Sequence, residues 1–507
     1  MQVYAANHSY NLRKSRLPQM KFLLLLLTSL LCGCQTSIQQ KHFHNAFVPD
    51  IRFDAQSCRQ YLRRLDQLID QAGVNDAQYI KTGLTTRLSR PLSSLPSTQA
   101  SDSKRRLDQE ARQIELHNLE SVLKLNNAVD IRWLTRQQQA LETCYSLLEP
   151  VADMSRAVPA LDDYVSWRRV LGLYPITSWF VRRQIDQLHR DLDILTKTKL
   201  PEPYLTYVPD DSAAAPNAAV VDVLTSLTDV TSSQLSQWLR QYRPVWQVQH
   251  QSRADYIGQP YWRLTQQNTN ASWFDAPQID IEHPVSFEYI SYTWFEDQLL
   301  PQMNYVIWFS ARPKTHWLDL VGGHLDGLTW RVTLNRQGQP LLFDSMHNCG
   351  CYHVFFTTPS VRLRVNLPDR EPPLVLHTVP DIQTNERYQL SVTAGDHYHI
   401  RMSLMDKAPA PGRIAYTSQS YNNLRRLPVY QQGQRSGMTR SLFDARGIVP
   451  GTQRLERFVL WPMGVPDPGE MRQQGRHPTA FIGRRYFDQP DLMDHLFTRR
   501  GTDEDDI

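Results

Sequence analysis

The chain has 507 residues, with 41% hydrophobic and 21% charged residues and a formal net charge of +4. This composition is typical of globular proteins and excludes collagen-like, wholly disordered and multi-span membrane classes. The only charged residues before position 34 are four basic ones, so the remaining chain carries 51 of the 55 basic residues against 51 acidic ones. Because no basic excess remains, the sequence argues against nucleic-acid binding.

A short apolar run over residues 22–31 follows Lys21. Its charge and length are typical of a secretory signal, and it is too short to span a bilayer comfortably. The run ends in Leu31-Cys32-Gly33-Cys34, which resembles the lipobox of bacterial lipoproteins. An ordinary cleaved signal is the alternative, and Met20 is a second candidate for the start of the chain.

The lipobox resemblance implies a signal peptide over residues 1–33 and an acylated Cys34 at the new N-terminus. Several acyl chains hold a protein stably, because each buried methylene adds about 0.8 kcal/mol. Gln35 follows the cysteine where an aspartate would imply inner-membrane retention in the enterobacterial sorting scheme. We therefore expect a lipid-anchored protein of the cell envelope, at the outer membrane and facing the periplasm, with the membrane as its first partner.

Four further cysteines follow the anchor, and in an oxidising compartment thiols pair. Cys58 and Cys144 lie in segments of helical pattern, which favours a disulfide between two helices. Cys349 and Cys351 are expected to form a local disulfide, for which the chain must bend at Gly350. The alternatives are two buried free thiols for the first pair, and a redox-active or metal-binding pair for the second.

The first part of the chain predicts helices. Between residues 55 and 198, apolar residues recur at spacings of three and four, most clearly over 58–69, 107–123, 131–148 and 179–195. The last run follows Thr177-Ser178, which are good N-cap residues. We expect a tether over 34–54, a helical domain over 55–198 and a linker over 199–220, where periodicity is lost.

The chemistry then changes to that of strands. A short helix is expected to open at Ser232 and end near Tyr242, and the rest of 221–405 predicts a β-rich domain. One hairpin joins 287–295 to 303–309, a second joins 330–334 to 341–343, and 388–402 adds a strand or a pair. Large apolar groups on both strand faces indicate a sheet that is covered on both sides.

Residues 406–507 contain many prolines and are expected to be an irregular segment packed on the β-rich domain. The predicted fold class is α+β, with a helical N-terminal domain, an antiparallel, sandwich-like β-rich domain and an irregular C-terminal wrap. The body, especially Gly327–Leu334 and Cys349–His353, resembles uncharacterised proteobacterial envelope proteins, and this resemblance implies no activity.

One segment is dense in reactive side chains. His347, Cys349, Cys351 and His353 alternate, so they share a face if the segment is extended. A pair at i and i+2 is half of a zinc or copper site, which His397 and His399 would complete, with His324 and His377 as further candidates. The alternative, which we favour, is that these histidines are structural and that no metal or other cofactor is bound.

Gly350-Cys351-Tyr352-His353 is similar to the Gly-Cys-x-Arg core of L,D-transpeptidases, in which a cysteine attacks peptidoglycan stem peptides. The resemblance implies a nucleophilic Cys351 with His324 as its base. Arg168-Arg169 and Arg182-Arg183 are expected to be solvated, the alternative being contact with anionic envelope polymers. We expect a structural or binding role with an envelope polymer or protein as partner; a cysteine-dependent cell-wall enzyme and a metal-binding protein are the alternatives.

Overall fold

The computed structural model describes much of the chain beyond residue 53. The described residues are 54–72, 79–82, 86–89, 139–144, 146–147, 157–158, 162–198, 201–212, 228, 230–268, 271–365, 367, 371–379, 382, 386–406 and 412–500. The expected signal peptide, Cys34 and all but the last residue of the expected tether lie outside them. Of the helices in the described residues, none is both long and apolar enough to cross a membrane.

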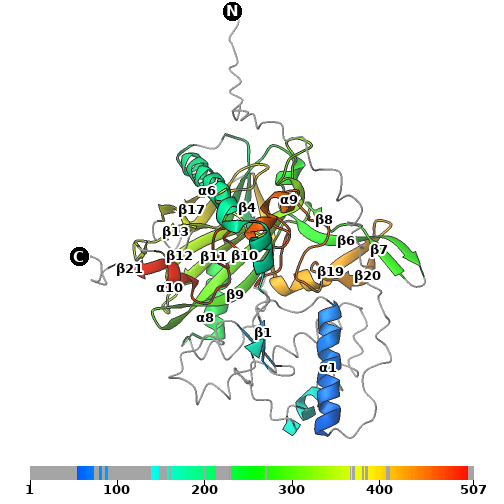
Figure 1. Cartoon of the computed structure of the whole chain (residues 1–507). Helices are drawn as coiled ribbons and strands as arrows, with labels where there is room; N and C mark the ends of the chain where they lie inside the picture. Colours follow the sequence, from blue (N-terminus) through cyan, green and yellow to red (C-terminus); the bar gives the residue numbers. More distant parts are fainter. Residues whose placement is uncertain are drawn as a thin grey trace, which may run out of the picture.

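The predicted fold class is wrong, because the described chain is organised around one large sheet and not around a helical domain and a sandwich (Figure 1). Its eleven strands follow the order β15-β13-β12-β11-β10-β9-β18-β4-β5-β16-β17. In that order they comprise Leu374–Thr378, Val354–Thr357, Pro340–His347, Gly323–Leu334, Gln298–Arg312, Val285–Phe295, Arg413–Ser420, Tyr204–Pro209, Val245–Gln249, Glu386–Val392 and His399–Asp406.

This sheet is barrel-like and nearly closed. Its edge strands β15 and β17 lie against each other, but no backbone ladder joins them in the sheet order. Instead, Nε2 of His377 in β15 lies 3.2 Å from the carbonyl oxygen and 3.4 Å from the amide nitrogen of Met402 in β17. We call this line of contact the seam. A side chain thus bridges the two edges where a ladder would complete the closure.

The predicted hairpins are confirmed. Strands β9 and β10 pair antiparallel, with Phe295 opposite Gln298, and β11 pairs with β12. The β9–β10 turn places Glu296 and Asp297 at φ 50° and 59°, as a two-residue hairpin turn of the favoured twist requires. The predicted pair over 388–402 is the antiparallel pair β16–β17.

The inside of the sheet forms a continuous apolar core. Tyr305 and Phe309 of β10 pack with Trp330 of β11 inside it. Helix α8 (Ser232–Gln241) contributes Leu239 to the same core, and the Tyr305 hydroxyl donates to the Leu239 carbonyl at 2.7 Å. The helix begins at the predicted residue, because Thr231 and Gln234 form a capping box.

A second sheet covers part of the outer face. It has the order β20-β19-β6-β7, with β8 paired to β6. These strands are Gln434–Arg440, Leu427–Gln431, Gln259–Asn268, Ala271–Phe274 and Gln278–Asp280. Val306 and Trp308, on the outer side of β10, pack with Trp262 of β6 and Val429 of β19. The inner side of the large sheet is therefore covered because the sheet curls on itself, and part of its outer side is covered by the smaller second sheet. Coverage on both sides was predicted, but not this way of achieving it.

Residues expected to form a separate helical domain belong partly to the sheet assembly. Helices α5 (Ser166–Leu171) and α6 (Tyr174–Lys197) precede β4, which lies inside the segment expected to be a linker. Helix α6 contacts both β15 and β17 and so lies over the seam. It starts before the predicted Thr177-Ser178 cap, because Pro175 occupies its first turn and Thr177 Oγ1 donates to the Gly172 carbonyl instead of capping.

The remaining N-terminal elements are mixed. They are helix α1 (Ala55–Ala72), helical residues 139–144 and 146–147, and the strands β1 (Tyr79–Thr82), β2 (Thr86–Ser89) and β3 (Ala157–Val158). The three strands form a small sheet in the order β2-β1-β3. This sheet is a further correction to an all-helical N-terminal domain.

The C-terminal segment is less irregular than predicted, since β18, β19 and β20 all lie within it. Beyond them are short elements: α9 (Arg457–Leu460), the 3₁₀ turn η6 (Trp461–Met463), α10 (Leu492–Leu496) and β21 (Phe497–Arg499), which pairs with β14 (Val361–Leu363). Two further 3₁₀ turns, η4 (Arg253–Asp255) and η5 (Tyr421–Arg426), lie earlier in the chain.

A buried ion cluster fastens this segment to the large sheet. Arg331 of β11 forms two hydrogen bonds with Asp344 of β12, at 2.9 and 2.5 Å, and donates to the Phe487 carbonyl at 2.8 Å. His353 Nε2 lies 2.8 Å from the same aspartate. Burial alone would raise the pKa of Asp344, but Arg331 and His353 lower it, so the carboxylate stays charged.

We expect Asp344→Asn to destabilise the fold by about 3–5 kcal/mol, because it leaves the buried Arg331 charge without its counterion. Chemical denaturation of the variant measures this loss. Asp275→Asn is the matched control, because Asp275 and Arg263 form a largely exposed pair at 3.9 Å and its loss changes stability by about 0.5 kcal/mol or less. Equal losses in the two variants would contradict the role of the cluster.

A cavity beneath helix α6 as the candidate functional site

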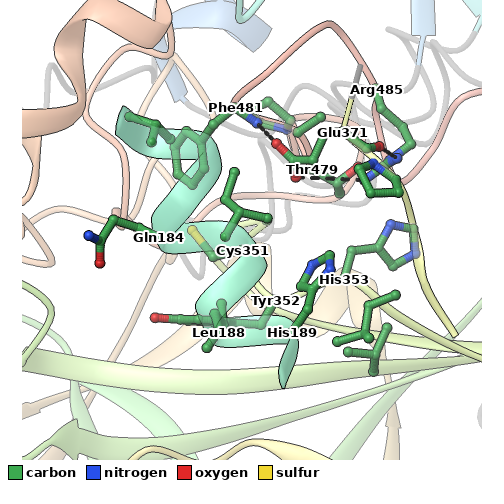
Figure 2. Close-up of a pocket in the computed structure, with 18 of the residues that line it drawn as sticks. Gln184, Leu188, His189, Cys351, Tyr352, His353, Glu371, Thr479, Phe481 and Arg485 are labelled. Atoms are coloured by element: carbon green, nitrogen blue, oxygen red, sulfur yellow. Dashed lines mark hydrogen bonds and ion pairs between the residues drawn. The ribbon is translucent and has the colours of Figure 1, made fainter. Parts of the chain in front are cut away.

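A cavity of about 210 Å³ lies between α6 and the end of the large sheet (Figure 2). Helix α6 supplies an apolar wall from residues one turn apart, among them Val181, Ile185 and Leu188. The opposite wall comes from the 350–354 turn, from 371–374 and from 478–485. The site thus lies next to the seam, where the sheet is least tightly closed.

Polar groups interrupt the apolar lining at a few points. The Glu371 carboxylate accepts from the amides of Phe481 and Ile482 at 2.8 and 3.0 Å, and Arg485 donates to the Glu371 carbonyl at 3.0 Å (Figure 2). These bonds hold the 478–485 wall in place. His189 of α6 also lines the cavity, and burial lowers its pKa, which favours a neutral imidazole.

Glu456 is an acidic residue of the cavity lining whose charged form is disfavoured by burial. Burial raises its pKa to about 7, although Arg312 and Arg454 oppose that shift. The carboxyl group is therefore neutral in mildly acidic solution and can donate a hydrogen bond. Near neutral pH it can acquire or lose a proton in response to a bound group.

The two cysteines lie on a tight turn. The His347 amide donates to the Cys351 carbonyl at 3.0 Å, and Gly350 and Tyr352 take φ values of 94° and 56°. Cys349 and Cys351 are free, so the expected local disulfide is not formed. Instead, the Cys351 amide donates to the Cys349 sulfur at 3.4 Å.

The expected common face of His347, Cys349, Cys351 and His353 does not exist, because this turn is not extended. His347 lies beside Asp326, and His353 lies beside Asp344. Cys349 packs in the core between the two sheets, whereas Cys351 lines the cavity. The positive φ values within the turn send the four side chains to four surroundings.

A chain of buried histidines and aspartates begins at His347. Its Nδ1 lies 3.3 Å from Asp326, which lies 2.8 Å from Nδ1 of His397. Nε2 of His397 is 3.3 Å from Asp255, and its ring stacks on Phe309 at 3.9 Å. All four ionisable groups are buried.

Burial and the neighbouring charges shift the pKa values along this chain in opposite directions. Burial alone would raise the pKa of Asp326, but the two imidazoles hold it well below its usual value. Burial alone would lower the pKa of His397, yet its two carboxylate neighbours raise it. Burial lowers the pKa of His347 despite Asp326. His397 therefore lies between two carboxylates that favour its protonated form, and it joins the core of the sheet to the η4 turn.

The residues considered for a zinc or copper site do not come together as a set of ligands in the described part of the chain. No group of three or more histidine, cysteine or acidic side chains in the described residues is arranged to hold a metal ion. His399 contacts the Phe356 ring at 4.7 Å, and burial lowers its pKa to about 3. His377 bridges the seam, and His397 is held by two carboxylates.

The expected pairing of Cys351 with His324 is also not formed. Nε2 of His324 lies 2.5 Å from the Pro277 carbonyl oxygen, and no hydrogen bond or ion pair joins it to Cys351 in the described part of the chain. An interaction of its thiol with the Cys349 side chain, followed by burial, raises the pKa of Cys351 well above its ordinary value. An activated cysteine nucleophile needs the opposite shift.

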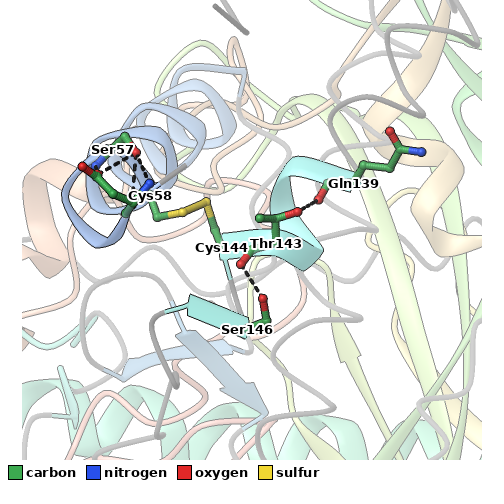
Figure 3. Close-up of a disulfide and its surroundings, with 7 residues drawn as sticks. Ser57, Cys58, Gln139, Thr143, Cys144 and Ser146 are labelled. Carbon is green, nitrogen blue, oxygen red and sulfur yellow. Dashed lines mark hydrogen bonds between the residues drawn. A yellow bond between two sulfur atoms is a disulfide. The ribbon is translucent and has the colours of Figure 1, made fainter. Parts of the chain in front are cut away.

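Cys58 and Cys144 form a disulfide between α1 and helical residues 139–144, with their Cα atoms 5.2 Å apart (Figure 3). Both are buried, together with Tyr61, Leu62 and Leu141. Near it, Ser57 and Asp54 exchange hydrogen bonds at the start of α1. This is the disulfide predicted from the helical patterns around Cys58 and Cys144.

Several groups of the site were missed in the sequence. Glu371, Glu456 and Arg485 are isolated in sequence, and only the fold brings them together. The apolar spacing of Val181, Ile185 and Leu188 was visible, but it indicated a buried helix face and not a cavity wall. Asp326 and Asp255 lie far from His397 in sequence, and nothing in the sequence pairs either of them with it.

No protein-family model, no curated protein and no solved structure matches this chain, so these comparisons indicate neither a family nor a function. The site is therefore interpreted from its own geometry.

We expect thiol titration of the denatured chain without reductant to detect Cys349 and Cys351, because both are free. Replacing both by alanine should lower the titre by two thiols before reduction. Reductant should then release two more thiols in either protein, from Cys58 and Cys144. An unchanged titre in the double variant before reduction would show that Cys349 and Cys351 are oxidised.

Proposed function

We propose that this chain is a lipid-anchored cell-envelope protein with a binding role, and that its ligand occupies the cavity beneath α6. The observation that carries the binding role is the cavity itself, with its mainly apolar lining and few convergent polar groups. The lipobox-like Leu31-Cys32-Gly33-Cys34 supports the anchor, and the disulfide between Cys58 and Cys144 is compatible with an oxidising compartment.

The lining favours a small amphipathic ligand. The α6 wall and Phe481 offer apolar surface to a hydrocarbon portion, and the Glu456 carboxyl offers a hydrogen bond to a polar head. A cavity of about 210 Å³ matches a short acyl chain and not a polymer. The raised pKa of the Cys351 thiol argues for a binding wall and against a nucleophile at this position.

Octan-1-ol and octanoate are suitable probes, and isothermal titration calorimetry on the purified full chain measures their binding. We expect Leu188→Trp to weaken both by about tenfold or more, because the indole fills the cavity. Ile194→Trp is the matched control on the same helix, since Ile194 is 59% exposed and does not line the cavity. Equal binding to both variants, or no binding to the unmodified chain, would contradict the proposal.

Octanoate binding should also depend on pH. Glu456, with a pKa of about 7, is neutral below that pH and negatively charged above it, so its charge repels the carboxylate of the probe at higher pH. Between about pH 6 and pH 8 we expect the affinity for octanoate to fall by about tenfold relative to that for octan-1-ol. Glu456→Gln should remove this difference. A difference that persists in the variant would exclude Glu456 as its source.

The anchor is tested by labelling cells with a fatty-acid analogue. We expect the label on the unmodified chain and on Cys32→Ser, but not on Cys34→Ser, because in the lipobox pattern only the second of these cysteines is acylated. Cys32→Ser is the matched control, since it removes a thiol two residues away. Label on Cys34→Ser would overturn the anchor without bearing on the cavity.

A further inference from the structure

An apolar surface of unusual size lies beside the cavity. Fifteen large hydrophobic side chains in the described residues are exposed, and twelve of them fall within three segments, 167–180, 317–320 and 458–459. They include Trp317 at 82% and Val170 at 73% exposure. We call the exposed hydrophobic side chains of these three segments the apolar face. Such clustering marks an interaction surface, whereas single exposed hydrophobic residues need no explanation.

The three segments form one continuous part of the molecule. The Val165 amide, just before α5, donates to the Gly464 carbonyl at 2.7 Å, which ties α5 to the end of η6. The Glu456 amide donates to the Leu320 carbonyl at 2.9 Å, which ties the 317–320 loop to the start of α9. Helix α9 runs directly into η6, and η6 also contacts α6. Figure 1 shows α6 and α9 as neighbours.

Basic groups outnumber the unpaired acidic groups around the apolar face. Residues 164–185 contain four arginines, and the flanking Asp186 and Asp162 are paired with Arg182 at 3.1 Å and with Arg484 at 2.5 Å. Arg169 donates to the Met463 and Gly483 carbonyls, whereas Arg168 is partly exposed and Arg183 is exposed. Asp319, in the 317–320 segment, is buried and accepts from the amides of Val321 and Gly322. Lys314 is exposed beside them. The surface therefore combines apolar side chains with a positive rim.

The arginines and the aromatic rings are paired. The guanidinium of Arg183 lies 3.8 Å from the Trp179 ring centroid, and that of Arg457 lies 4.8 Å from the Phe458 centroid. Trp179 also meets Phe180 edge to face at 4.9 Å. Tryptophan and arginine together are enriched at the headgroup level of bilayers, where a ring lies between apolar and polar surroundings and a guanidinium reaches phosphates.

We propose that the apolar face docks on an anionic lipid bilayer, with its tryptophans at headgroup level and its arginines against lipid phosphates. This inference rests on the acylated Cys34 of the proposed function, because the anchor brings the body to the leaflet. Asp54 follows Cys34 by 20 positions, a span of at most about 70 Å. Such a tether does not select a face, so the orientation comes from the apolar face.

Charge favours this occupant over a second copy of the chain. Two copies that met through this face would bring two sets of basic residues together, Arg168, Arg183 and Lys314 among them, whereas anionic lipids neutralise them. Docking also places the α6 cavity beside the lipid, since Val181 and Leu188 lie on the same helix as Trp179 and Phe180. An amphipathic ligand would then reach the cavity from the membrane.

Tryptophan quenching by brominated lipids tests the docking. The acylated full chain is reconstituted in vesicles of phosphatidylethanolamine with phosphatidylglycerol, and in phosphatidylcholine vesicles, each with brominated acyl chains. We expect quenching in the anionic vesicles, weaker quenching in the neutral ones, and loss of most of it when Trp167, Trp179 and Trp317 are replaced by phenylalanine. Added salt should reduce the quenching.

Charge variants distinguish docking of the apolar face on the bilayer from its being held near the bilayer by the anchor alone. Arg168→Gln and Arg183→Gln should each lower the ratio of docked to undocked chain by about fivefold. Arg190→Gln is the matched control on the distal half of α6 and should change nothing. Absence of quenching in a chain that carries the fatty-acid label would overturn the docking and leave the anchor standing. Energy transfer between labelled copies, without quenching, would assign the face to a second copy and also overturn the proposal.

Discussion

The incomplete closure of the large sheet is the constraint on which the other features depend. Two sheet edges carry unpaired backbone groups that must be covered, and here β15 and β17 meet with the His377 imidazole at the Met402 backbone and without a backbone ladder in the sheet order. Helix α6 lies over this line and packs Leu192 against Ile400. Because α6 cannot fill the whole seam, a cavity remains beneath it, and its outward side stays exposed. The proposed ligand site and the proposed docking surface are thus two sides of one covering helix.

Elements that are stabilised by interactions between residues close in sequence could be predicted from the sequence. The hairpins β9–β10 and β11–β12 and the start of α8 at Ser232 followed from alternation, turn residues and a cap. The closure was not predictable, because it depends on the parallel pairs β18–β9, β18–β4, β16–β5 and β13–β15, which join distant segments. Strand β4 lies in a stretch rich in proline, and β18 has no clear apolar alternation. Neither could be recognised without its partners.

The candidate site shows the same division. The Cys58–Cys144 pair was predicted from two helical patterns. The common face predicted for the Cys–His segment was wrong, because alternating residues share a face only in an extended chain. Left-handed backbone at Gly350 and Tyr352 turns that segment back on itself. The groups that do come together, such as Asp326 with His397, or Glu456 with the α6 wall, are far apart in sequence. One sequence contains no signal for such pairs, since an isolated buried carboxylate looks like any other aspartate or glutamate.

The hydrogen bond between Arg331 and the Phe487 carbonyl bears on the order in which parts of the chain can fold. Strand β11 lies near the middle of the sheet, yet one of its charged groups finds its last hydrogen-bond partner more than 150 residues later. Phe497, later still, fills the cluster with Phe355 of β13. Until the final segment is in place, the Arg331 side chain in the central strands therefore lacks one of its hydrogen-bond partners and stays in contact with water. Completion of the last residues of the chain is thus itself a checkpoint for folding of the large sheet.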